Sequence, residues 1–157
     1  MASSFQDRNR SGNFNMPDTR TNFRFDSNYL KGGYFLDAQC EQMRPGILDT
    51  IAFDIAKVFY NLRLNSSQLR RFFNQLRIIE QSIGKYRSFE SATQDLLALK
   101  SAARYQVGRG LVREEFMQFI ERNVELAVQS ECSLKRGFIP HFAAVLGYFV
   151  YISRERV

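Results

Sequence analysis

The chain has 157 residues, with 22 Lys and Arg against 16 Asp and Glu, and a net charge of +6 at pH 7. With 45% hydrophobic residues it is long enough to bury one core by itself. Its longest apolar run, residues 143–152, is too short and interrupted to span a bilayer, and residues 1–7 lack the apolar region of a secretory signal. We therefore expect one cytoplasmic domain, with or without a tail, that requires no membrane.

Few residues could serve as metal ligands or catalytic groups. Cys40 and Cys132 are far apart and His141 is the single histidine, so a zinc site within one chain lacks ligands. We expect both cysteines to be free and reduced, and no metal or cofactor. The sequence contains no HExxH, GxSxG, DxD or GxxxxGK[ST] motif, and a histidine in an aromatic helix is more often a core residue than a general base. These features argue against an enzyme.

Positive charge is concentrated in the middle of the chain. Residues 57–113 contain eleven basic and three acidic side chains, a local balance of +8. Such a stretch is either a solvated face or a surface for an anionic partner such as nucleic acid. Composition alone leaves both interpretations open.

Residues 1–44 show no sustained period of two or 3.6, which predicts a largely disordered N-terminal tail. Its arginines and aromatic residues could stack on unpaired bases, but a passive tail is favoured because the segment is almost neutral. Tyr34, Phe35 and Leu36, after a Gly pair, are candidates for docking on the core.

Pro45 and Gly46 mark the start of an all-α domain, a compact bundle of about five helices over residues 45–157. Apolar spacing and capping residues predict helices over 47–62, 66–83, 88–107, 111–131 and 134–155. Pro140 would break a helix already under way, so the regular part of the last one is expected to begin only at about Ile139. That helix is apolar nearly all round, which predicts a central position or a partner surface.

The helix expected over 66–83 combines an apolar face with a polar flank. Asn65 and Gln68 have the spacing of a capping box. The helical period places Arg70, Asn74 and Arg77 together beside the apolar face, where they could donate hydrogen bonds to an anionic backbone.

Lys100 falls within the apolar sector of the third predicted helix. The favoured interpretation is a lysine whose ammonium reaches past the edge of the core, and the alternative is a lysine at a ligand groove. Arg109 lies between two glycines in the following turn, which leaves it exposed.

Two ordered segments carry a family resemblance. A (S/T)SQ(I/L)R-x-F-(Y/F)-N-x-(V/L)-R pattern is matched over residues 66–77, and an LK-x(4)-Y-x-x-GR pattern over residues 99–109. An aromatic C-terminal helix is matched loosely by Phe138, Phe142 and Phe149. Over about residues 45–155 the chain resembles the small helical subunit of the type III-A (Csm-type) CRISPR interference complex.

The resemblance implies a non-catalytic subunit of an RNA-guided ribonucleoprotein for antiviral defence. Several copies would form an inner filament that contacts the guide and target RNA backbone, beside backbone and large subunits, without reading sequence. The expected RNA-contacting residues share a basic or amide side chain, and they are Arg70, Arg77, Lys100, Arg104, Arg109, Arg71, Asn74 and Lys57. Four of them, Arg70, Arg77, Lys100 and Arg109, match family positions.

Two alternatives remain. The segment that starts at Ser66 could open the recognition helix of a helix-turn-helix DNA-binding regulator, although the link before it is longer than the usual turn. The bundle could also be a purely structural helical adaptor.

Overall fold

The computed structural model describes residues 17–154. The disorder expected for residues 1–16 lies outside this range. The described chain contains helices α1 (Thr50–Asn61), α2 (Ser66–Ser82), α3 (Phe89–Gly108), α4 (Glu114–Ala127), the π-helix η1 (Ser133–Phe138) and α5 (Ile139–Arg154).

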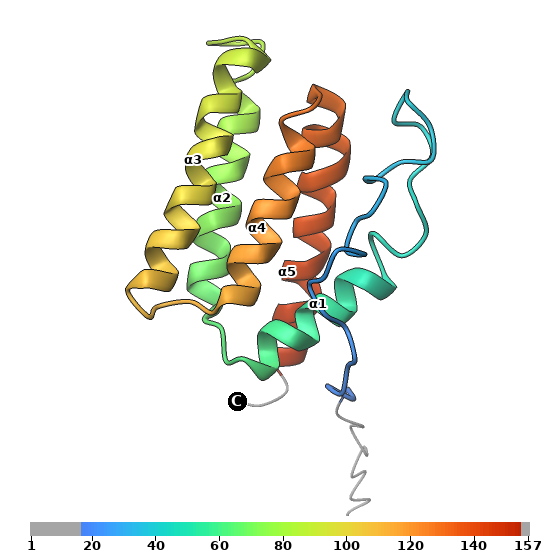
Figure 1. The fold of residues 1–157 in the computed structure, drawn as a ribbon, viewed down its shortest axis with the longest axis vertical. Helices are drawn as coiled ribbons and strands as arrows, with labels where there is room; N and C mark the ends of the chain where they lie inside the picture. Colours follow the sequence, from blue (N-terminus) through green and yellow to red (C-terminus); the bar gives the residue numbers. More distant parts are fainter. Residues whose placement is uncertain (1–16, 155–157) are drawn as a thin grey trace, which may run out of the picture.

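Helices α2, α3, α4 and α5 lie side by side, and α1 crosses at their base (Figure 1). Helix α3 packs between α2 and α4, α2 also packs on α5, and α1 packs on α5. Over residues 17–154 the backbone forms isolated β-bridges but no strand, which confirms the predicted all-α bundle. No helix in this range is both long and apolar enough to cross a membrane.

The helix starts follow local capping chemistry. The side chains of Asn65 and Ser88 accept hydrogen bonds from backbone N–H groups in the first turns of α2 and α3, as predicted. Gln68 does not complete a capping box, because its Nε2 donates instead to the carbonyl of Leu111 at 3.0 Å. Helix α1 begins three residues later than expected, because Gly46 has φ +87° in a turn and Asp49 caps the helix.

The last helical segment changes type at the place that Pro140 marks. Residues 133–138 form the π-helix, and the regular helix begins at Ile139, as predicted. Pro140 follows η1 after one residue, and the N–H of Ile139 still donates to the carbonyl of Leu134, so the helix changes its type where a proline would interrupt regular α-helical bonding. Gly137 is needed in η1, because a Cβ there would lie 2.4 Å from a ring carbon of Tyr34.

Aromatic rings fill the centre of the bundle. Phe119 of α4 is fully buried and has ring centroids within 5.4 Å of Phe59 from α1 and 5.1 Å of Phe142 from α5. Helix α5 is central on this face, as predicted. Its opposite face is partly exposed and, with Leu48, lines an apolar groove of about 500 Å³.

Residues 17–44 differ from the flexible tail that the sequence predicts. They follow an irregular path along the bundle (blue to cyan in Figure 1), and Tyr29, Leu30 and Tyr34 are buried in the core. Tyr34 docks as expected and Phe35 packs against the core, whereas Leu36 is exposed. A periodicity search misses this segment because its buried residues have no regular spacing.

A buried chain of hydrogen bonds joins this segment to α4 and α5. The hydroxyl of Tyr34 donates to Oδ1 of Asn123 at 2.6 Å, and Nδ2 of Asn123 donates to the hydroxyl of Tyr29 at 3.0 Å. Nδ1 of His141 donates to the carbonyl of Ile47 at 2.6 Å, so Nε2 of the neutral ring accepts from Tyr29 at 2.8 Å. Burial raises the pKa of both tyrosines and lowers that of His141 to about 4. His141 is therefore a core histidine, as predicted.

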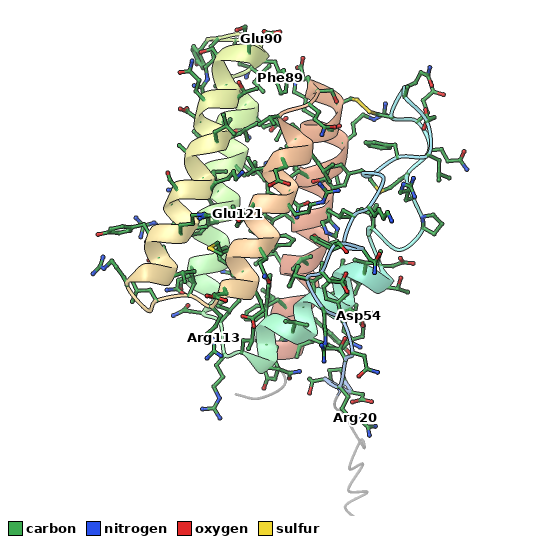
Figure 2. The ribbon with its side chains drawn as sticks, viewed as in Figure 1. Arg20, Asp54, Phe89, Glu90, Arg113 and Glu121 are labelled. Atoms are coloured by element: carbon green, nitrogen blue, oxygen red, sulfur yellow. A yellow bond between two sulfur atoms is a disulfide. The ribbon has the colours of Figure 1, made fainter. Side chains whose placement is uncertain are left out.

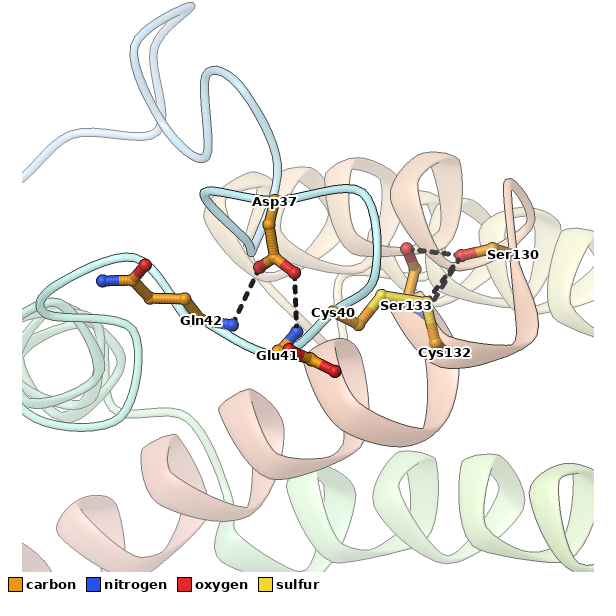
Figure 3. Close-up of a disulfide and its surroundings, with 7 residues drawn as sticks. All are labelled: Asp37, Cys40, Glu41, Gln42, Ser130, Cys132 and Ser133. Carbon is orange, nitrogen blue, oxygen red and sulfur yellow. Dashed lines mark hydrogen bonds between the residues drawn. A yellow bond between two sulfur atoms is a disulfide. The ribbon is translucent and has the colours of Figure 1, made fainter.

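The expectation of two free cysteines is wrong. Cys40 and Cys132 form a disulfide across 92 residues of sequence, with a Cα–Cα distance of 6.3 Å (Figure 3). Residues 36–42 turn back on themselves, held by Asp37, whose carboxylate accepts from the N–H groups of Glu41 and Gln42. These hydrogen bonds lower the pKa of Asp37. The turn brings Cys40 to the start of η1, a proximity that sequence separation does not reveal.

Candidate nucleic-acid interface

The predicted basic residues of α2 point in two directions. Arg70, Arg71 and Asn74 are exposed, and Arg77 is half-buried with Nη1 3.6 Å from Glu80. At about 100° per residue, Arg70, Asn74 and Arg77 lie within roughly 60° of one another, whereas Arg71 is turned about 100° from Arg70. Arg71 is therefore the one of these four that lies beside α3.

Lys100 and Arg104 on α3 point to α4. Nζ of Lys100 lies 3.6 Å from Glu125, and Nε of Arg104 donates to Glu121, which Figure 2 labels. This hydrogen bond to the carboxylate of Glu121 raises the pKa of Arg104. Lys100 is half-buried with its ammonium at the bundle edge, in agreement with the favoured interpretation. Both cations are partly neutralised by the neighbouring helix.

The opposite side of α3 faces α2 and forms a concave site. A groove of about 230 Å³ runs between the two helices, beside the α3–α4 connection at the lower left of Figure 1. Its polar lining is Gln68, Arg71, Gln75, Gln106 and Arg109. We call this site the α2/α3 groove.

The two arginines of the α2/α3 groove differ from the other predicted cations. Both are exposed, and within residues 17–154 neither forms an ion pair. The guanidinium of Arg109 lies 5.6 Å from the ring centroid of Tyr105, at the rim of the groove. The groove therefore presents two positive charges that are available to an anion.

Lys57 does not belong to this groove. It lies on α1, 3.1 Å from Asp54 and 4.6 Å from the ring centroid of Phe53, and its ammonium donates to the carbonyl of Arg20 at 3.4 Å. Its charge is used within the fold.

The structure thus regroups the predicted residues. It brings Arg71 and Arg109 into one site, whereas Arg70, Asn74, Arg77 and Lys100 do not line that site. Sequence reasoning missed the three glutamines. A signal for them was present, because Gln68 and Gln75 are seven residues apart, on the α2 face that carries Arg71.

Across residues 17–154, no group of three or more His, Cys, Asp or Glu side chains is placed to hold a metal ion.

The comparisons with known proteins give the family. The family model described as Csm2 Type III-A matches residues 43–155.

The chain belongs to the Csm2 type III-A family. This confirms the resemblance that the motifs at 66–77 and 99–109 indicated, and both motifs lie inside the matched range. Csm2 proteins are the small subunit of the Csm CRISPR effector complex. Neither a curated protein nor a solved structure matches the chain significantly. Membership of Csm2 favours the subunit interpretation over a helix-turn-helix regulator.

Proposed function

We propose that this Csm2 chain is a non-catalytic subunit that lies along RNA in a cytoplasmic, guide-directed effector complex. It contacts the backbone of the guide and target RNA without reading sequence, because base pairing with the guide already supplies specificity. The observation that carries this proposal is the α2/α3 groove, where Arg71 and Arg109 face a common space without carboxylate partners in the described chain.

The charge distribution supports a revised order of importance among the candidate residues. Arg71 and Arg109 come first, and the exposed flank of Arg70 and Asn74 comes second. Arg77, Lys100, Arg104 and Lys57 come last, because breaking an existing ion pair offsets part of any gain from phosphate binding. Copies of the chain side by side on one strand would add their weak contacts, so avidity in the complex exceeds the affinity of one protomer.

The double variant Arg71→Ala/Arg109→Ala should weaken binding of target RNA to the assembled complex about tenfold. The reason is that each of the two exposed arginine–phosphate contacts contributes roughly 0.7 kcal/mol, and together they correspond to about one factor of ten in Kd. The measurement is the Kd of labelled target RNA at fixed salt, for two unrelated guide and target pairs. The same fold-loss is expected for both, since backbone contacts carry no sequence information.

The matched control is Arg24→Ala/Arg136→Ala, which removes the same charge from two exposed arginines outside the groove. It should change the Kd less than twofold. Circular dichroism must show that both double variants keep the helical fold. An unchanged Kd for the groove variant would overturn the proposal and favour a structural adaptor. Equal losses of affinity in both double variants would overturn the role of the groove, because they would show an effect of overall charge alone.

A further inference from the structure

The α2/α3 groove contains hydrogen-bond acceptors that a phosphate, whose oxygens only accept, would not use. Arginine side chains are donors only, which suits phosphate oxygens, but each glutamine amide is both a donor and an acceptor. Gln68, Gln75 and Gln106 come from both helices and line the same space as the two arginines. A ligand that satisfies all of these groups must offer donors and acceptors as well as negative charge.

One of these amides is already oriented. Nε2 of Gln68 donates to the carbonyl of Leu111 at 3.0 Å, which ties α2 to the α3–α4 connection. The Nε2 end of the amide is therefore used within the protein, and the Oε1 acceptor is left for a ligand. A fixed acceptor favours a ligand that donates from a defined position.

The rest of the lining is apolar. Phe72 and Val112 are buried and Ala102 is half-buried, and all three contribute to the wall of the groove. An apolar wall does not favour a hydrated phosphate but does favour the face of an aromatic ring. At the rim, the guanidinium of Arg109 lies over Tyr105 and offers a second planar surface.

A nucleotide matches all three kinds of group in the groove. Its planar ring suits the apolar wall, its donor and acceptor edge suits the glutamine amides, and its anionic phosphate suits the two arginines. We propose that the α2/α3 groove binds one unstacked nucleobase of the bound target RNA. Its ring lies against the apolar wall, its edge contacts the glutamine amides, and Arg71 and Arg109 hold the adjoining phosphate. This inference rests on the proposed function, and adds to it a base-binding site in each copy of the chain.

The test is abasic scanning in the assembled complex. A series of target RNAs, each with one abasic nucleotide, is bound to complexes that contain either the unchanged chain or Gln75→Ala/Gln106→Ala. One position should have its base in the groove, and there the abasic change removes the contact with the glutamines. At that position the abasic change should weaken binding to the unchanged complex about fivefold more than it weakens binding to the variant complex, as expected for loss of one hydrogen bond. This comparison of four affinities cancels the loss of pairing with the guide, which is common to both complexes.

The matched control is Gln94→Ala, an exposed glutamine of α3 outside the groove, for which no coupling to any abasic position is expected. Absence of coupling at every position for Gln75→Ala/Gln106→Ala would overturn the base-binding site. If Arg71→Ala/Arg109→Ala still weakens RNA binding in that case, the groove binds phosphate alone and the proposed function stands. If neither change affects RNA, both proposals fail together.

Discussion

Reducing the disulfide between Cys40 and Cys132 should lower the free energy of unfolding by about 4 kcal/mol. The bond closes a loop with a sequence separation of 92 residues, which includes α1, α2, α3 and α4. In the chain-entropy account, the closed loop restricts the unfolded chain far more than the folded one. Denaturant unfolding of the oxidised protein, with and without a phosphine reductant, measures the difference.

The control is Cys40→Ser/Cys132→Ser, which should unfold at the lower denaturant concentration whether or not reductant is present. Coinciding unfolding curves for the oxidised and reduced forms of the unchanged protein would contradict the prediction. Cytosolic thiols are kept reduced, so under the proposed function, which is cytoplasmic, the reduced curve is the one that applies. In that form the segment before α1 is held by its buried side chains and hydrogen bonds alone.

Lowering the pH from 7 to 4 should destabilise the fold by roughly 3 kcal/mol through His141. Burial lowers the pKa of His141 from its ordinary value of 6.5 to about 4. Above pH 6.5 the ring is neutral in both states, and stability is complete. As the pH falls from 6.5 to 4, the unfolded state takes up a proton that the folded state does not, so stability decreases with acidity. Below about pH 4 this residue causes no further loss.

His141 is the single histidine of the chain, so NMR titration of its ring gives the folded-state pKa without an assignment problem. Urea unfolding at pH 7, 5.5 and 4.5 gives the matching change in stability. Backbone hydrogen bonds lower the pKa of Asp37 below its ordinary value of 3.8. The stability that Asp37 contributes is therefore lost only as the pH falls to about 3.8 and below, which separates it from the effect of His141. A ring that titrates near 6.5 in the folded protein would contradict the prediction. His141→Gln should be less stable at pH 7 and lose the pH dependence between 6.5 and 4.

The helices could be predicted because their information is local. Asn65 and Ser88 act as caps, Pro140 lies in the first turn of α5, and apolar residues recur at the helical period. The ends of the helices could be predicted less accurately than their positions. Helix α4 begins at Glu114 and ends at Ala127, inside the predicted range of 111–131, because turns at both ends carry apolar residues that continue the helical spacing.

The candidate site could be predicted only in part, because periodicity gives the face of a helix but not its neighbour. Lys100 and Arg104 are one turn apart on α3, and Glu121 and Glu125 are one turn apart on α4, so the two pairs come into register when the helices pack. Nothing in the α3 sequence indicates this pairing. Arg109, roughly opposite on the same helix, faces α2 instead.

The buried chain of Tyr34, Asn123, Tyr29 and His141 also bears on where the folding unit begins. The family model starts to match at residue 43, yet both tyrosines precede that position. A polypeptide that began at residue 43 would lack both tyrosines, so the Oδ1 of Asn123 and the Nε2 of His141 would lose these hydrogen bonds, and the core would lose two buried rings. The matched region is thus smaller than the region that completes this core. Two of the four side chains in this buried chain of hydrogen bonds, Tyr29 and Tyr34, lie before the residues that the family model matches.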